Sequence, residues 1–282
     1  MNVDAVLRFI REREKVRVAK EVDHAPRPWS KDVILQRYRF CNVRREDDKV
    51  TRWVAKNWRD RKENRNDPDL WFAMLVARFF NEISTLEAAH YPGKGWDPIE
   101  VGARLRLHRQ EHRLFNPAYI VSTAGLTMDK LDYVIEMVLN PAWERREEIR
   151  PTTQDSLGSF ARRLSLLHGL KGFMTGQVVA DMKYAPVLRK AHDWQTWALS
   201  GPGSRRGLNR ICGRPVEAPW KESDWHAQLV DLHTAVNNQL KKEGNPLYPL
   251  HAQDLQNCLC ETDKYLRAAQ GEGKPKQNYP GY

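Results

Sequence analysis

The stretch His251–Arg267, HAQDLQNCLCETDKYLR, contains acidic residues at a spacing that could serve proton transfer. At 100° per residue of a helix, Asp254 and Glu261 fall on the same side, seven residues apart. An adjacent apolar stripe is formed by Leu255, Leu259, Thr262 and Leu266. A partly buried carboxylate pair has shifted pKa values and suits a general base. The alternative is two exposed acids beside a packed helix, and the pattern leaves both interpretations open.

A second stretch, GPGSRRGLNRI at 201–211, could bind an oxyanion. Glycines surround Ser204, Arg205 and Arg206, and a flexible backbone would let amide and guanidinium groups enclose a phosphate. A solvated basic loop is the alternative. The motif G-x-x-x-x-G-K-[ST] does not occur in the sequence, so we do not expect a P-loop kinase.

The stretch 37–54, RYRFCNVRREDDKVTRWV, interleaves arginine with aromatic residues. This mixture suits phosphate contacts and base stacking, and it contains Arg44 and Arg45. A salt-bridged start of a helix is the alternative interpretation.

The stretch 166–184, LLHGLKGFMTGQVVADMKY, predicts two helices joined by a tight turn. Gly169 and Gly172 allow positive φ and close approach of a backbone, and the free N–H groups of the second helix could hold a phosphate. This is the logic of a helix-hairpin-helix, which grips DNA without reading its sequence. Gly169, Lys171 and Gly172 are therefore candidate DNA contacts, with an ordinary turn between helices as the alternative.

No metal or cofactor site is expected. Cys258 and Cys260 lie about 200° apart around a helix, so they cannot share one ion. His108 and His112 have the spacing of zinc ligands, but no third ligand is evident and surface histidines are the preferred interpretation. No G-x-S-x-G motif or nucleophile triad is present.

The composition favours a polyanionic partner. The chain has 282 residues and a net charge of +10, and residues 1–66 carry 19 Lys and Arg against 11 Asp and Glu. There is no apolar run of about 18 residues, so no membrane association is expected. Four cysteines give no disulfide framework, and the start of the sequence lacks a signal-peptide pattern, so we expect a cytoplasmic protein.

Helical periodicity dominates the sequence and alternating strand patterns are scarce. We therefore expect an all-α protein of ten or more helices, with DLWFAMLVARFFNEI as a core helix. Residues 1–270 are expected to form a single helical domain, with a basic N-terminal lobe (1–150) and a C-terminal lobe (151–270) as a softer subdivision. Residues 271–282 are expected to be a flexible tail.

Three of these stretches together resemble the helical domain of phage thymine-hypermodification proteins: RYRFCNVRREDDKVTRWV, GFMTGQVVADMKY with GPGSRRGL, and HAQDLQNCLCETDKYLR. That family includes the helical part of 5-hydroxymethyluracil DNA kinases. It also includes amino acid:DNA transferases, or α-glutamyl/putrescinyl thymine pyrophosphorylases. The resemblance covers about residues 37–267. LCETDKY, in place of the usual LCEFDKY, is its most specific part.

The resemblance implies a DNA-glycosylase-like helical fold and a reaction on intact double-stranded DNA that contains modified uracil. Without a phosphate-binding loop, the transferase branch is favoured. A small amine or amino acid would attack a phosphorylated or pyrophosphorylated 5-hydroxymethyluracil, and phosphate would leave; if the protein is phage-encoded, this takes place in the host cytoplasm. The base would be flipped out of the duplex to be reached.

This chemistry needs a carboxylate base for the protonated amine and cationic or N–H donors for the leaving phosphate. The base candidates are Asp181, Asp254 and Glu261. The phosphate candidates are Arg44, Arg45, Ser204, Arg205, Arg206 and Lys264. Asn42 could hydrogen-bond the uracil edge.

Two other classes remain open. A DNA glycosylase on the same fold would use an aspartate or lysine after the hairpin, such as Asp193 or Lys183, and would release a free base. A non-catalytic DNA-binding protein would use its acids structurally.

Overall fold

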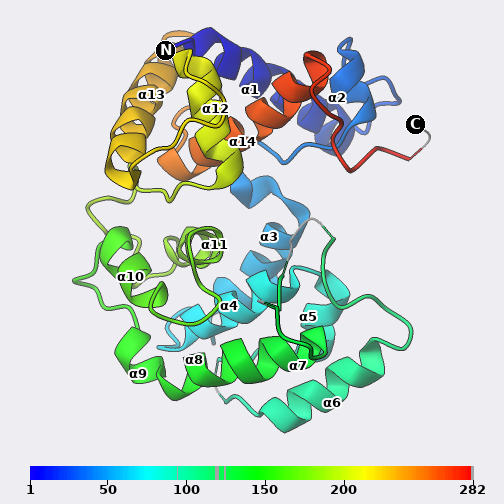
Figure 1. Cartoon of the computed structure of the whole chain (residues 1–282), viewed down its shortest axis with the longest axis vertical. Helices are drawn as coiled ribbons and strands as arrows, with labels where there is room; N and C mark the ends of the chain where they lie inside the picture. The colour runs from blue at the N-terminus through cyan, green and yellow to red at the C-terminus, as the bar shows by residue number, and fades with distance from the viewer. Residues whose placement is uncertain (94, 118–120, 124, 281–282) are drawn as a thin grey trace. The chain divides into compact units, whose positions relative to one another are not determined.

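The computed structural model describes residues 1–93, 95–117, 121–123 and 125–280, and its regular elements are helices (Figure 1). Within these residues there is no β-strand, and one isolated antiparallel bridge joins Tyr38 to Asn278. The all-α prediction is confirmed. No helix in this part of the chain is long and apolar enough to cross a lipid bilayer.

Contacts divide the chain into two compact units. Residues 1–48 and 195–282 form unit 1, and residues 49–194 form unit 2. This division does not fall near Pro151, where the sequence suggested a boundary between lobes. The reason is that the first helix packs on helices from the last third of the chain, which composition cannot show.

Within its described residues, up to 280, unit 1 is built from five α-helices with short helical turns. The α-helices are α1 (Val3–Arg17), α2 (Val33–Arg37), α12 (Pro202–Cys212), α13 (Glu222–Lys242) and α14 (Ala252–Ala269). A π-helical turn (Val18–Val22) continues α1, and a 3₁₀ turn spans Arg45–Asp47. The core joins apolar faces of α1, α12, α13 and α14, with Trp225 fully buried in it.

Helices α12 and α14 pack closely because glycines face the contact. A Cβ on Gly203 would overlap Cys260 Sγ, and a Cβ on Gly207 would overlap the carbonyl oxygen of Leu259. These glycines are four residues apart and therefore lie on one face of α12. The stretch that the sequence suggested as a flexible oxyanion loop is thus mainly a helix whose glycines permit close packing against α14.

Unit 2 contains the remaining α-helices and two further π-helical turns. The α-helices are α3 (Lys49–Val54), α4 (Leu70–Phe80), α5 (Ile83–Ala89), α6 (Pro98–His108), α7 (Lys130–Asp132), α8 (Asn140–Glu144), α9 (Arg146–Ile149), α10 (Leu157–Leu164) and α11 (Phe173–Met182). The π-helical turns are Ala55–Arg59 and Tyr133–Leu139. Every residue of α4 is buried, so the prediction of a core helix there is confirmed.

The chain beyond residue 270 is held in place as far as the structure describes it. The Arg39 amide donates to the Gln277 carbonyl (3.0 Å) and the Tyr279 amide donates to the Arg37 carbonyl (2.9 Å). The Tyr279 side chain is buried, with its ring 5.2 Å from that of Trp29. This differs from the flexible tail expected from composition, because Gln277 and Tyr279 contact residues of unit 1 that are distant in the sequence.

Candidate functional site

The segment 39–45 is hydrogen-bonded to one face of α14. The Cys41 amide donates to Glu261 Oε2 (3.0 Å), and the Arg45 amide donates to Asp254 Oδ1 (3.2 Å). Between them, Asn257 Nδ2 donates to the Asn42 carbonyl (3.2 Å). The shared face of Asp254 and Glu261 is therefore the face that binds this segment.

Glu261 combines burial with an oxygen that remains available. Its side chain is 8% exposed, and Oε2 accepts from the Cys41 amide and from Lys264 Nζ (2.9 Å). Among the described residues, none donates to Oε1. Lys264 Nζ also donates to the Arg39 carbonyl (2.8 Å) and lies 4.6 Å from the ring centroid of Phe40. The Lys264 Nζ is thus held beside a carboxyl group whose second oxygen receives no hydrogen bond from the described residues.

The thiols near Glu261 are poor nucleophiles. The negative charge of Glu261 raises the pKa of Cys41 well above its usual value. Burial, assisted by the Glu261 charge, raises the pKa of Cys260 to about 12. Both sulfurs therefore stay protonated near neutral pH.

Asp254 differs from Glu261 because both its oxygens accept backbone hydrogen bonds. Oδ2 accepts from the His251 amide (3.1 Å) in a capping box at the start of α14, and Oδ1 accepts from the Arg45 amide. These bonds satisfy donors that a helix start would otherwise leave unpaired. The geometry gives Asp254 a structural role at the start of α14.

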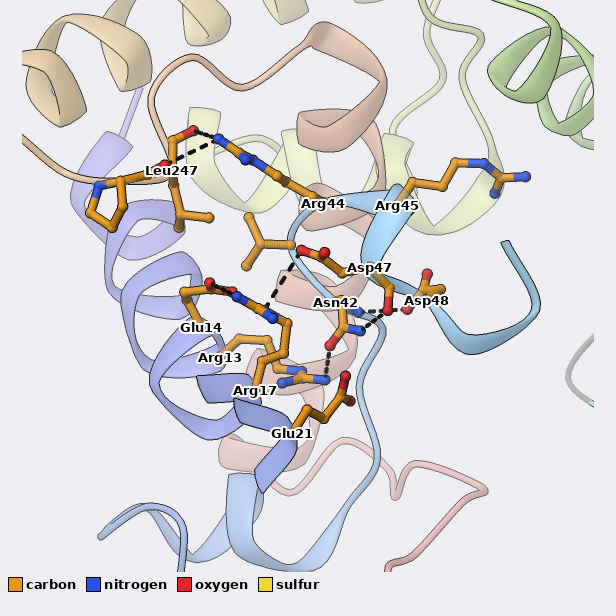
Figure 2. Close-up of polar contacts among 12 residues, drawn as sticks. Arg13, Glu14, Arg17, Glu21, Asn42, Arg44, Arg45, Asp47, Asp48 and Leu247 are labelled. Atoms are coloured by element: carbon orange, nitrogen blue, oxygen red, sulfur yellow. Dashed lines mark hydrogen bonds and ion pairs between the residues drawn. The ribbon is translucent and has the colours of Figure 1, made fainter. Parts of the chain in front are cut away.

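Asn42 is held inside unit 1 by Arg13, a residue that the sequence analysis missed (Figure 2). Arg13 Nη2 donates to Asn42 Oδ1 (2.5 Å), and Nε donates to the Phe40 and Cys41 carbonyls. Asn42 Nδ2 donates to the Asp47 carbonyl (2.9 Å). Both ends of the amide are thus engaged and Asn42 is buried, which does not favour the proposed contact with a uracil edge.

A signal for Arg13 was present in the sequence. It lies on the apolar stripe of α1, between Ile10 and Val16, where a charged residue must find buried partners. Together with the α14 contacts, its bonds to carbonyls 40 and 41 fix the segment that carries the Cys41 amide.

Asp48 follows the 3₁₀ turn after this segment, and its pKa is shifted. Its Oδ1 accepts from the Asn42 amide (3.0 Å), and burial raises its pKa from 3.8 to about 6. An acid with a raised folded-state pKa stabilises the fold while protonated, below its unfolded pKa. That contribution is lost as the pH rises through about 6.

We therefore expect Asp48→Asn to stabilise the protein at pH 7 but not at pH 4. Asparagine keeps the acceptor for the Asn42 amide and carries no charge. Because Asp48 is only partly shielded from solvent, the gain at pH 7 should be about 1 kcal/mol, or about 2 °C in Tm. Calorimetry at both pH values measures it, and an equal shift at pH 4 would contradict the assignment.

The arginines expected to bind phosphate are largely engaged within unit 1. Arg44 Nη2 donates to the Pro246 and Leu247 carbonyls (3.1 and 3.0 Å), and the Arg45 side chain is buried. Among the described residues, no carboxylate pairs with Arg44. Its charge is therefore available, whereas that of Arg205 is paired with Glu222 (2.8 Å).

Ser204 and Arg206 belong to the α12–α14 contact. Ser204 is fully buried and its Oγ accepts from the Gly201 amide (2.9 Å), which caps α12. Arg206 Nε and Arg210 Nε each donate to the buried Asp263 (2.9 Å both). Sequence analysis missed the roles of Asp263 and Arg210. The i, i+4 spacing of the two arginines was the signal that could have indicated them.

Three candidate residues, Asp181, Lys183 and Asp193, belong to unit 2, and each forms hydrogen bonds within that unit. Asp181 is fully buried and forms a bidentate pair with Arg78 (2.5 and 2.6 Å), which fixes its side chain in the core. Asp193 accepts from the Leu157 and Gly158 amides and caps α10. Lys183 Nζ is buried and donates to the Trp194 carbonyl (2.8 Å).

The glycine turn between α10 and α11 has the expected backbone. Gly169 and Gly172 have φ of +79° and +47°, and Gly172 precedes the first residue of α11. Lys171 is exposed on the turn, while Leu170 is buried beneath it. The turn thus presents a basic side chain and a helix start to solvent.

No group of three or more potential metal ligands occurs in the part of the chain that the structure describes. His108 and His112 stack on each other, with ring centroids 4.6 Å apart.

Comparison with known proteins identifies the family. No curated protein and no solved structure matches this chain. The family model described as "5-hmdU DNA kinase, helical domain" matches residues 2–275, which include both units and the whole of α14. A match over nearly the full length confirms the relation suggested by LCETDKY and its companion stretches: the chain belongs to the family of the 5-hmdU DNA kinase helical domain.

Proposed function

We propose that this protein modifies 5-hydroxymethyluracil in DNA by replacing a phosphate or pyrophosphate group with an amine. The observation that carries the proposal is the match to the 5-hmdU DNA kinase helical domain over residues 2–275. A 5-hmdU DNA kinase would produce the phosphorylated base in DNA, and the proposed transfer would use that base as its substrate. The net charge of +10 supports DNA as the macromolecular substrate.

In the proposed reaction, the amine nitrogen attacks the methylene carbon attached to C5 of the uracil. The N–C bond forms as the C–O bond breaks, and phosphate leaves with the bonding electrons. The proton released from the amine goes to Glu261. Its Oε1 receives no hydrogen bond from the described residues, while Oε2 is held by the Cys41 amide and Lys264.

Lys264 is proposed to stabilise the departing phosphate. Its Nζ uses two donors, on Glu261 and on the Arg39 carbonyl. A primary ammonium group has three donors, so one remains. Arg44, whose charge is not paired with a carboxylate among the described residues, is proposed to contact phosphate as well.

We further propose that α10, the glycine turn and α11 form a DNA-binding hairpin on a glycosylase-like fold, and that the target base is flipped out of the duplex. The exposed start of α11 and the positive φ of both glycines support this role.

The affinity for DNA should then fall steeply as the salt concentration rises, and substitutions in the hairpin should weaken it. Because each phosphate contact releases counterions, Lys171→Glu should weaken DNA binding several-fold and lower the slope of log K against log salt by about 1. Lys242→Glu, at the exposed end of α13, changes the net charge equally and serves as the control. Fluorescence anisotropy across a salt series measures both. Equal effects of the two variants would exclude a specific contact at the turn.

The reaction itself is tested by mass spectrometry of nucleosides. Duplex DNA with phosphorylated 5-hydroxymethyluracil is incubated with the protein and candidate amines. An aminated nucleoside with release of phosphate supports the proposal. Release of a free base would indicate a glycosylase, and unchanged DNA with tight binding would indicate a non-catalytic protein.

A further inference from the structure

Three cationic side chains of unit 1 lie around one aromatic ring near the end of the chain, and the proposed chemistry on α14 does not use them. The charged groups of Lys20, Arg27 and Arg39 lie 5.4, 5.4 and 5.6 Å from the centroid of the Tyr279 ring. No two of these charges can therefore be farther apart than twice the longest of these distances. We refer to these four residues, together with Trp29, as the basic patch.

The two rings of the basic patch hold the cations in defined positions. Lys20 Nζ and the Arg27 guanidinium also lie 5.8 and 4.7 Å from the centroid of the Trp29 ring. The Trp29 and Tyr279 rings are in edge contact with each other, and Trp29 Nε1 donates to the Ala25 carbonyl (2.9 Å). An aromatic face attracts a cation through its quadrupole, so the rings fix these positive charges without neutralising them.

Arg39 supplies available hydrogen-bond donors to the basic patch. It is exposed, and within the described part of the chain its guanidinium neither donates a hydrogen bond nor pairs with a carboxylate. Lys20 differs, since Glu21 Oε1 lies 3.8 Å from its Nζ. A guanidinium has five N–H donors in a planar fork that matches the oxygens of a phosphate. A phosphate at Arg39 would therefore meet donors that the described residues leave available.

The proximity of the positive charges favours an anionic partner. The pKa of Lys20 is lowered, first by burial and also by nearby guanidinium groups, against the opposing charge of Glu21. Those guanidinium groups belong to Arg13, Arg27 and Arg39. Cations held this close repel one another, and an anion among them removes that repulsion. Duplex DNA carries one negative charge per about 1.7 Å of its axis, so its backbone can meet several cations over this short span.

The basic patch is joined to the proposed phosphate contact on α14 through Arg39. The Arg39 carbonyl accepts from Lys264 Nζ (2.8 Å), while the Arg39 side chain lies over the Tyr279 ring. Lys264 Nζ also donates to Glu261 Oε2 (2.9 Å). All of these residues belong to unit 1, so the basic patch and the α14 face are parts of the same compact unit.

We infer that the basic patch binds the sugar-phosphate backbone of DNA next to the target nucleotide, with Arg39 as a direct phosphate contact. The inference rests on the proposed function, and it assigns that function a DNA-binding surface on unit 1 to which the end of the chain contributes Tyr279. An acidic protein is the rival partner. DNA is favoured because Lys264, the neighbour of Arg39, is the proposed contact of the target's phosphate, and the backbone of that nucleotide must pass nearby.

Fluorescence anisotropy of the full chain with a duplex that contains 5-hydroxymethyluracil, measured across a salt series, tests the basic patch. Arg39→Gln should weaken binding several-fold and lower the slope of log K against log salt by about 1, because one phosphate contact is lost. Lys242→Gln removes an equal charge at the exposed end of α13 and is the control, with a smaller effect on both quantities. Equal effects of the two variants would overturn the inference.

Tyr279 provides a second test in which no charge changes. Tyr279→Leu should weaken DNA binding several-fold, because the cations lose the ring that holds them. Tyr279→Phe keeps the ring and should bind like the unmodified protein, and melting temperatures show that both variants fold. If the leucine variant binds DNA as tightly as the phenylalanine variant, the ring does not organise a DNA-binding surface and the inference fails.

Competition with poly-glutamate distinguishes DNA from an acidic protein. Poly-glutamate should displace DNA poorly. Binding of poly-glutamate that depends on Arg39, while DNA binding does not, would identify an acidic protein as the partner and overturn the inference.

The same variants separate this inference from the proposed function. DNA binding that depends on Arg39, without any aminated nucleoside, would refute the transfer reaction and leave the basic patch standing. Where transfer occurs, Arg39→Gln should lower its rate at limiting DNA but not at saturating DNA, because the contact is made equally before and during the reaction. An unchanged rate at limiting DNA would refute the basic patch and leave the reaction standing.

Discussion

Glu261→Gln is expected to reduce amine transfer at least about 100-fold at pH 7 while leaving folding and DNA affinity near those of the unmodified protein. Glutamine can place its oxygen where Glu261 Oε2 lies and keep the bonds from the Cys41 amide and Lys264. Its NH₂ group then takes the position of Oε1, where the described residues provide no donor to clash with it. The substitution therefore removes the proton acceptor and little else.

The pH dependence of this variant distinguishes a base from a structural acid. If Glu261 takes the proton from the amine, raising the pH deprotonates the amine in solution and should rescue Glu261→Gln. The rescue should be about tenfold per pH unit below the amine pKa. A loss of structure would not be rescued in this way. Wild-type rates at pH 7, or a flat profile after a real loss of rate, would contradict the assignment of Glu261.

Asp254→Asn is the matched comparison on the same helix face. Both Asp254 oxygens accept backbone N–H groups, from His251 and Arg45, so an asparagine must turn its NH₂ group toward one of these donors. We expect a loss of about 1–3 kcal/mol of stability with transfer retained in the folded protein. Loss of transfer without loss of stability would instead show that the two carboxylates act as a pair.

Helical periodicity was sufficient to predict the all-α fold and the buried α4, because both depend on residues close in sequence. It also placed Asp254 and Glu261 on one face. It could not show that the face is occupied by segment 39–45, since the Cys41–Glu261 bond joins residues 220 positions apart. Periodicity therefore could not show which of the two carboxyl groups has an oxygen that accepts no hydrogen bond from the described residues.

The stretch Gly201–Ile211 shows a different limit of sequence analysis. Glycine beside arginine is typical of an oxyanion loop, and the same residues suit a tightly packed helix. The structure shows Gly203 and Gly207 against α14, and Arg206 and Arg210 on Asp263. Only the contact partner decides between the two interpretations, and that partner lies some fifty residues further along the chain.

Gly207→Ala provides a sharp test of this packing, because replacing glycine with alanine inside a helix normally raises stability, whereas here we expect stability to fall. In the interior of a helix, replacing glycine with alanine stabilises by about 1 kcal/mol. Here the new Cβ would overlap the Leu259 carbonyl oxygen, a backbone atom that can move only if α14 moves. We therefore expect a net loss of at least about 2 kcal/mol, seen as a Tm lower by about 4 °C or more.

Gly102→Ala is the control for this substitution. Gly102 lies within α6, and the nearest atom to its new Cβ would be at the far end of the Arg106 side chain. That side chain can rotate away. The Tm of the Gly102→Ala protein should stay level or rise. Because α14 also carries Glu261, Gly207→Ala should lower transfer together with stability, whereas Gly102→Ala should lower neither. A Gly207→Ala protein as stable as the Gly102→Ala protein would show that α12 and α14 do not pack through this glycine face, and the position of Glu261 would then need another explanation.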